Sequence, residues 1–170
     1  MKPFWLRFLL LLFGLAWSFV AADDKKEASR FEMTRKERQL LELVNKERAK
    51  ADLPPLRPHP LLFKAARAHS ANMAKQRKMD HILDGKRPAQ RVEEVGYNWS
   101  KVAENLITAD QSDVPLETIV KSWMDSKPHR ENILLKDVTE TGLGIATNAK
   151  GEIYCTQIFA RPRKRVKSGH

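Results

Sequence analysis

Four short polar segments of this chain contain histidine, glutamate or amide residues beside predicted helix starts or loops, where their side chains can converge. His81 follows a long apolar stretch, Glu104 lies in the middle of the chain, and His129 lies in a polar segment further on. Two imidazoles and a carboxylate can hold Zn2+ and leave one position open for water, which then becomes a nucleophile near neutral pH. No HExxH spacing is present, so the three side chains must converge through the fold. The competing interpretation is a hydrogen-bonded structural contact.

The residues around this trio have simpler interpretations. Ser126 is predicted to be a helix N-cap rather than a nucleophile, because the sequence identifies neither the orienting acid nor the oxyanion donors of a triad. Asp125 is predicted to be a surface residue at a helix end, and its alternative role is to supply an acid to the site. His69 falls on an apolar helical stripe, which favours a buried histidine that is hydrogen-bonded in the core or supports the site. His59 precedes a predicted helix and is expected to cap it or to be exposed.

Amide side chains and one cysteine complete the set of candidate residues. Asn105 and Asn132 are predicted to hold loop backbone around the site. Gln157 either donates into the site or pairs within a sheet, and both alternatives stay open. Cys155 alternates with Ile153 in a predicted strand and is expected to be a small packed residue. Because it is the only cysteine, the chain forms no intramolecular disulfide and no multi-cysteine zinc site.

The first 22 residues have the pattern of a secretory signal peptide. Lys2 and Arg7 supply positive charge, residues 8–20 are apolar, and Val20-Ala21-Ala22 offers small residues for cleavage. A membrane span needs about 20 apolar residues, and this run is shorter, so an uncleaved anchor is the less favoured alternative. Export to the extracellular space or the periplasm is therefore expected.

The net charge of +10 is concentrated at the C-terminus. Residues 161–170 contain five basic residues and no acid, so they are predicted to be a basic tail: Arg161, Arg163, Lys164, Arg165 and Lys167. A short basic tail can bind any polyanion, including an anionic envelope or nucleic acid, but it is equally typical of a solvated segment. No specific recognition of nucleic acid is expected.

The elements that must position the candidate residues are helices followed by strands. A charged linker over residues 23–33 precedes Thr34, which has capping-box spacing with Glu37. A helix is predicted from there to Pro54. The other predicted helices cover residues 60–78, 89–95, 113–125 with Asp113 as cap, and 126–133, and the predicted strands cover residues 142–147 and 152–160. Residues 80–112 are less regular and have room for further strands. This order indicates an α+β domain with helices around a small, mostly antiparallel sheet.

Five segments, in this order, resemble the bacterial branch of the CAP superfamily, the cysteine-rich secretory and pathogenesis-related proteins, also called SCP-like extracellular domains. The resemblance covers residues 38–160. Its most specific part is the match of residues 126–134, SKPHRENIL, to the family signature Ser-x-x-His-Arg-x-Asn-Ile-Leu. The other segments are LELVNKER at residues 41–48, LLFKAARAHSANMA at 61–74, GYNW with VAENL at 96–106, and GLGIA with TQIFA in the closing strands.

This resemblance implies a three-layer α-β-α sandwich over residues 34–160 with a groove that collects two histidines and two glutamates. His81, Glu104 and His129 match three of these positions. The position expected for the second glutamate holds Ser126, with Asp125 beside it, so a four-residue site is incomplete. In several family members the histidines bind a divalent metal such as zinc, which makes Zn2+ the cofactor that the resemblance implies.

Three functions from different classes are compatible with these features. The favoured hypothesis is a non-enzymatic extracellular binding module whose groove, with or without a metal, holds a lipid or another envelope component. The second is a metal-dependent hydrolase in which Glu104 acts as general base. The third is a polyanion-binding protein that acts through residues 161–170. The missing second glutamate weakens the hydrolase hypothesis.

Overall fold

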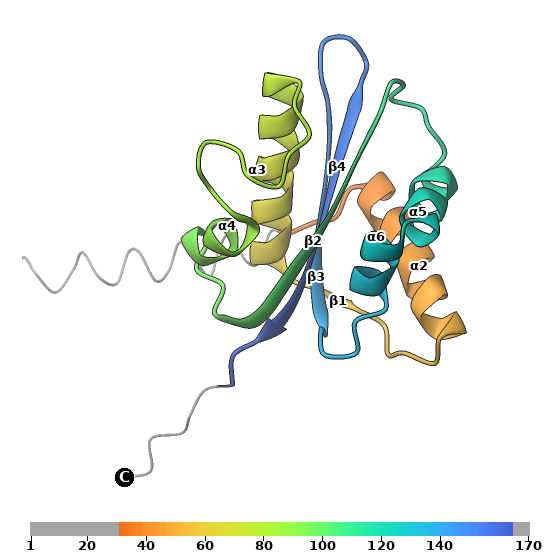
Figure 1. Cartoon of the computed structure of the whole chain (residues 1–170), viewed down its shortest axis with the longest axis vertical. Helices are drawn as coiled ribbons and strands as arrows, with labels where there is room; N and C mark the ends of the chain where they lie inside the picture. The colour runs from red at the N-terminus through yellow and green to blue at the C-terminus, as the bar shows by residue number, and fades with distance from the viewer. Residues whose placement is uncertain (1–30, 165–170) are drawn as a thin grey trace, which may run out of the picture. The chain divides into compact units, whose positions relative to one another are not determined.

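Two layers of helices enclose a four-stranded sheet in the computed structural model, which describes residues 31–164 (Figure 1). The strand order is β1-β3-β4-β2, with β1 parallel to β3 and the other neighbours antiparallel. The strands are β1 (Arg57–Pro58), β2 (Trp99–Ala109), β3 (Glu140–Thr147) and β4 (Ile153–Pro162). The three-layer α-β-α architecture and the mostly antiparallel sheet were both expected and are confirmed.

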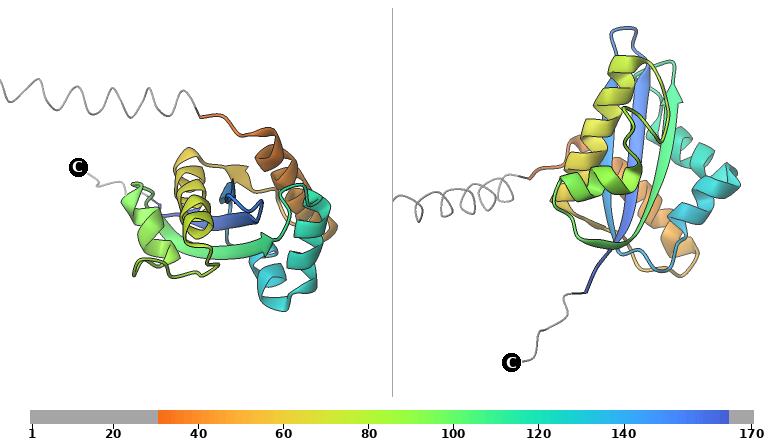
Figure 2. Two further views of the ribbon diagram at one scale, coloured as in Figure 1. Left: turned by 90° about the horizontal axis from the view of Figure 1, so that it is seen from above. Right: turned by 60° about the vertical axis from the view of Figure 1, so that its left-hand side comes forward.

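Helices α3 (Pro60–Gln76) and α4 (Pro88–Glu94) form one layer, and α2 (Arg35–Lys50), α5 (Leu116–Asp125) and α6 (Lys127–Ile133) form the other. Figure 2 shows the two groups on opposite sides of the strands when the domain is seen from above. Strand β2 lies at the edge of the sheet. Residues that flank this edge strand can therefore approach it from both helical layers.

Helix α3 lies directly on strand β3 because two glycines remove the side chains between them. A Cβ atom at Gly142 would lie 2.1 Å from the carbonyl carbon of Leu62, and one at Gly144 would lie 2.3 Å from the carbonyl oxygen of Ala66. Residues two apart in a strand face the same side of the sheet. The close approach lets Ser70 hydrogen-bond the carbonyl oxygen of Gly144 at 2.9 Å, which fixes the position of α3 along the sheet.

The predicted starts of α2 and α3 are confirmed, and in both helices a side chain caps the first turn. Thr34 and Glu37 form the reciprocal capping box at the start of α2. His59 caps α3, since its Nδ1 accepts a hydrogen bond from the backbone N–H of Leu61. Pro60 occupies the first turn of the same helix. The ends of α2 and α3 fall a few residues before those predicted.

Two predicted caps are wrong in detail. Helix α5 begins after Pro115, which holds the N-cap position itself with φ at −58°, so Asp113 does not cap it. Ser126 does stand at the junction of α5 and α6, but its side chain makes no capping hydrogen bond. Pro128, at the second position of α6, removes one of the two N–H groups that a cap can accept from.

The irregular middle of the chain contains the longest described strand, β2. Its sequence lacks a clean alternation of apolar and polar residues because Glu104, Asn105 and Leu106 are buried in succession. The short predicted helix at 89–95 is present as α4. At the other end, β4 continues to Pro162, and the backbone N–H of Arg163 bonds the Asn98 carbonyl oxygen, so the predicted tail begins inside the sheet.

Several expectations concern residues outside the described part of the chain. The predicted signal peptide at 1–22, most of the linker and residues 165–170 of the tail belong to this group. Among the helices that the structure describes, none combines the length and apolar composition needed to cross a membrane.

Candidate functional site

Glu104, on edge strand β2, is the centre of the site. Its side chain is 1% exposed and points toward the layer of α3 and α4. Arg91 Nη2 donates to Glu104 Oε2 at 2.7 Å and to Oε1 at 3.0 Å. His81 Nδ1 lies 2.9 Å from the same Oε1 and must donate to it, because a carboxylate only accepts. Both oxygens of this carboxylate are therefore hydrogen-bonded within the protein.

Arg91 also holds the loop that carries His81. It extends from α4, and its Nη1 donates to the carbonyl oxygens of His81 at 3.0 Å and Lys86 at 2.8 Å. One guanidinium thus fixes the acid of the site and the backbone of the residue that bonds this acid. The planar fork of arginine suits this task, since it supplies several donors in fixed directions.

His69 reaches the same network from α3. Its Nε2 lies 3.1 Å from the carbonyl oxygen of Asp80 and 3.9 Å from Glu104 Oε1. The residue is 1% exposed, and burial is the main cause that lowers its pKa below 6.5. His69 is therefore a neutral core histidine whose Nε2–H donates to Asp80, and its burial was expected from the apolar stripe of the helix.

His81 and His129 are the members of the trio that solvent reaches. The hydrogen bond to Glu104 is the largest cause acting on His81, and its pKa is raised above 6.5. The pKa of His129, on α6, is lowered by burial and further by the nearby charge of His81. The two imidazoles are thus close enough to interact, and their environments move their pKa values in opposite directions.

Asn105 and Asn132 attach α6 to the edge strand. Asn105 Nδ2 donates to the carbonyl oxygen of His129 at 2.9 Å. Asn132 Nδ2 donates to Asn105 Oδ1 at 2.9 Å and to the Glu104 carbonyl oxygen at 3.3 Å. Neighbouring residues of a strand point to opposite faces of the sheet. Glu104 therefore bonds the layer that contains α4, and Asn105 bonds the layer that contains α6. Both asparagines bond backbone, but it is the backbone of α6 and β2 and not the loop backbone that the sequence predicted.

Three other candidate residues are not brought into the site. Asp125 pairs with Lys121 at 2.6 Å, and its side chain is 64% exposed. Ser126 makes no bond to the trio at the helix junction. Gln157 is buried in β4, where its Nε2 lies 3.4 Å from Thr141 Oγ1 in β3. The position of the missing glutamate therefore receives no substitute from these residues.

Arg91 is the residue that sequence reasoning missed. Two signals could have revealed it. A glutamate predicted inside a covered strand requires a cation, because an unpaired buried carboxylate is very costly. Arg91 also adjoins the buried Val92 in a short helix, which places it near the inward face.

The donor set does not fit a metal centre with three protein ligands. Within residues 31–164, no group of three or more His, Cys, Asp or Glu side chains is placed to hold a metal ion. In this structure Glu104 Oε1 accepts from Arg91 and His81 Nδ1, and Oε2 accepts from Arg91, so the carboxylate is bonded to protein groups. What the described residues offer to a ligand is the pair of imidazoles alone.

Comparison with known proteins gives a consistent result. The sequence model of the cysteine-rich secretory protein (CAP) family matches residues 41–159. An uncharacterized Bacillus subtilis protein, YkwD, is 32% identical over 126 residues, which cover 74% of this chain and 47% of that protein. The chain thus spans about half the length of this curated relative.

Solved structures of bacterial surface and extracellular proteins share the fold. An outer surface protein from Borrelia burgdorferi is 20% identical with a TM-score of 0.71, over 78% of this chain and 97% of that one. An SCP-domain extracellular protein from Bacillus anthracis is 22% identical with a TM-score of 0.64, over 77% of this chain and 45% of that one.

Proposed function

Because the chain belongs to the cysteine-rich secretory protein (CAP) family, we propose that it is an extracellular, non-catalytic binding module whose ligand contacts His81 and His129. The single observation that supports this best is the complete engagement of Glu104. Both oxygens of this carboxylate are hydrogen-bonded by Arg91 and His81 inside the protein. Glu104 therefore acts as a support for His81.

The same observation weakens the hydrolase hypothesis. A general base needs an accessible oxygen within reach of the proton that it removes, whereas Glu104 is 6% exposed and doubly bonded. Moving it toward a metal would leave the Arg91 guanidinium buried and unpaired. Breaking a buried pair in this way costs about 3–5 kcal/mol, which lowers a binding constant by roughly two to four orders of magnitude.

The imidazole pair suits a ligand with hydrogen-bond acceptors. His81 donates to Glu104 through Nδ1, so its remaining nitrogen, Nε2, faces the ligand and is charged more often than in a free histidine. His129 stays neutral at neutral pH and both donates and accepts. An anionic or carbonyl-bearing envelope component, including a lipid headgroup, has the matching chemistry.

The test is retention on sedimented envelopes of the producing bacterium. The exported chain, residues 23–170, is compared with His81→Ala, His129→Ala and a variant truncated after Lys164. Asp125→Asn is the matched control, because Asp125 is exposed and lies apart from the trio. We expect both histidine variants to lose retention and the truncated and control variants to keep it.

Two results would contradict the proposal. Loss of retention in the truncated variant alone would assign binding to the basic tail. Zinc-dependent cleavage of peptide, ester or phosphodiester substrates, abolished in both histidine variants, would establish the hydrolase instead.

A further inference from the structure

Two large hydrophobic side chains are exposed on either side of His81. Met79 is 47% exposed and Ile82 is 49% exposed, and in the part of the chain that the structure describes these are the only large hydrophobic side chains left exposed. The side chain of His81 between them is 52% exposed. Hydrophobic residues scattered singly over a surface need no explanation, whereas a local concentration of them marks a contact with a partner or a membrane.

The backbone around these two residues is anchored on the domain. The carbonyl oxygen of Asp80 lies 3.1 Å from Nε2 of the buried His69, and Asp80 Oδ1 accepts a hydrogen bond from the backbone N–H of Ile82 at 2.9 Å. The loop thus presents Met79 and Ile82 on a fixed backbone, and burying them inside the domain would break these bonds.

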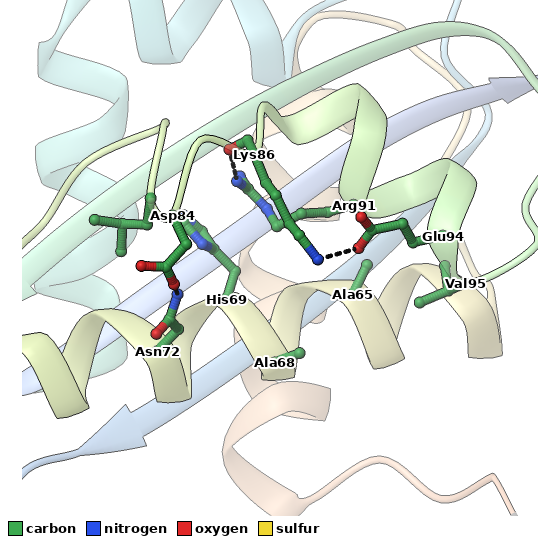
Figure 3. A pocket seen from close by; sticks show the side chains of 10 residues that line it. Ala65, Ala68, His69, Asn72, Asp84, Lys86, Arg91, Glu94 and Val95 are labelled. Carbon is green, nitrogen blue, oxygen red and sulfur yellow. Dashed lines mark hydrogen bonds and ion pairs between the residues drawn. The ribbon is translucent and has the colours of Figure 1, made fainter.

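The second half of the loop is anchored as well. Asp84 accepts a hydrogen bond from Asn72 of α3 at 2.8 Å, and Arg91 of α4 donates to the carbonyl oxygen of Lys86 at 2.8 Å (Figure 3). Leu83 is 4% exposed and packs in the core against α3 and β2. The loop therefore divides its hydrophobic side chains between the domain, which receives Leu83, and the solvent.

The chain around the exposed pair is basic. Residues 75–87 contain five basic residues, all exposed, and two acids. Lys78 pairs with Asp80 and Lys86 pairs with Glu94, both at 2.9 Å. The other three basic residues make no ion pair with a described residue: Lys75, Arg77 and Arg87.

This combination fits an anionic lipid bilayer better than a protein surface. Asp84 is bonded only by neutral amides and keeps its charge, but the three free cations outnumber it. Peripheral binding to a bilayer scales with the apolar area inserted and with the attraction of basic side chains to anionic lipid. A stable protein interface buries roughly 800 Å² on each partner, which two neighbouring side chains do not supply.

We propose that residues 75–87 dock the domain on an anionic lipid bilayer. Met79 and Ile82 insert at the boundary between the headgroups and the acyl chains, and the three free cations contact the lipid phosphates. This contact goes beyond the proposed function, because it does not require the ligand contacts of His81 and His129. It places the exposed imidazole of His81 at the level of the headgroups.

The test is sedimentation of the exported chain, residues 23–170, with vesicles of equal parts phosphatidylglycerol and phosphatidylcholine. We expect Met79→Ser/Ile82→Ser to bind these vesicles at least about tenfold more weakly than the wild type. Met79→Leu/Ile82→Leu is the matched control, because it keeps both side chains apolar and should bind as the wild type does. All three proteins keep the basic tail, so its contribution is the same in each. Vesicles of phosphatidylcholine alone should bind the wild type more weakly.

Insertion is measured directly by NMR of the methionine methyl groups, with the chain bound to small bicelles of the same lipids. With nitroxide-labelled lipid present, we expect the methyl signal of Met79 to broaden. The methyl signal of Met73, a residue that is 0% exposed, should keep its width.

Three results would overturn the proposal. If the serine and leucine variants bind the vesicles equally, or if the Met79 methyl signal keeps its width, the exposed pair does not enter the bilayer and the basic tail accounts for binding. If the wild type does not bind these vesicles, the occupant is not a lipid bilayer, and loss of envelope retention in the serine variant would then assign the pair to a protein partner. Envelope retention in the histidine variants tests the proposed function separately and does not decide this result.

Discussion

Arg91 Nη2 lies 2.7 Å from Glu104 Oε2, in an ion pair whose two side chains are 9% and 1% exposed. This pair joins α4 to the edge strand and, through the second arginine nitrogen, to the loop that carries His81. In this domain the glutamate of the trio serves as an anchor for a histidine. Its partner, Arg91, bonds both carboxylate oxygens and so limits their availability to a ligand or a metal.

Removing Arg91 should destabilise the fold far more than removing a surface cation. We expect Arg91→Met to lower the free energy of unfolding by about 3–5 kcal/mol, because it leaves the buried Glu104 carboxylate without its counter-charge. Urea denaturation measures the change. Lys86→Met is the matched control: the Lys86–Glu94 pair is 51% exposed on both sides and should contribute at most about 1 kcal/mol. Equal effects of the two substitutions would contradict the anchoring role of Arg91.

Zinc affinity should depend on the same arginine. We expect the wild-type chain to bind zinc weakly, because two imidazoles alone are a poor ligand set. Arg91→Met leaves Glu104 Oε2 without its hydrogen bond, so this variant should bind zinc more tightly and gain thermal stability from it. Calorimetric titration of both proteins checks this, with Arg91→Met/His129→Ala as the control that loses the gain. Tight stoichiometric binding by the wild type would show that Glu104 leaves Arg91 readily and would contradict the structural role.

The sequence predicted most helices and the closing strands because their signals are local. The Thr34–Glu37 capping box and Pro60 require only neighbouring residues. The trio could be selected as a set only through the family resemblance. Its members, His81, Glu104 and His129, lie after α3, on β2 and on α6, which are distant along the chain. The sequence offered only indirect signals for Arg91 and none that paired it with Glu104, because the direction of a buried side chain depends on tertiary packing. Asp113 failed as a cap because Pro115 starts the helix itself.

The contact between α3 and β3 should not tolerate a methyl group. We expect Gly144→Ala to destabilise the domain by about 3 kcal/mol or more, because its Cβ would meet the Ala66 carbonyl oxygen at 2.3 Å and a backbone atom cannot rotate away. Thermal and urea unfolding measure the loss. Gly151→Ala is the control, since its Cβ meets nothing within 4 Å and only its φ of +84° opposes the change, at about 1–2 kcal/mol. A smaller loss at Gly144 than at Gly151 would mean that α3 moves away from the sheet at little cost.

His81 and His129 should titrate on opposite sides of pH 6.5. We expect the pKa of His81 to lie above this value because of its hydrogen bond to Glu104, and the pKa of His129 to lie below it because of burial and the charge of His81. NMR titration of the imidazole protons measures both. Glu104→Gln should lower the pKa of His81, and His81→Ala should raise that of His129, whereas Asp125→Asn should change neither.

The pKa directions of His81 and His69 also determine how the stability of the fold changes with pH. The folded-state pKa of His81 is raised, so its bond to Glu104 stabilises the fold fully below pH 6.5, and this contribution is lost as the pH rises through the folded-state pKa. The pKa of His69 is lowered in the folded state. As the pH falls below 6.5, His69 is protonated in the unfolded chain before it is protonated in the fold. Its burial then lowers the free energy of unfolding. Urea unfolding at a series of pH values should therefore show that His81→Ala costs more at pH 5.5 than at pH 8.5. The reverse order would mean that His81 bonds Glu104 as a neutral ring and that the charge assigned to this histidine is wrong.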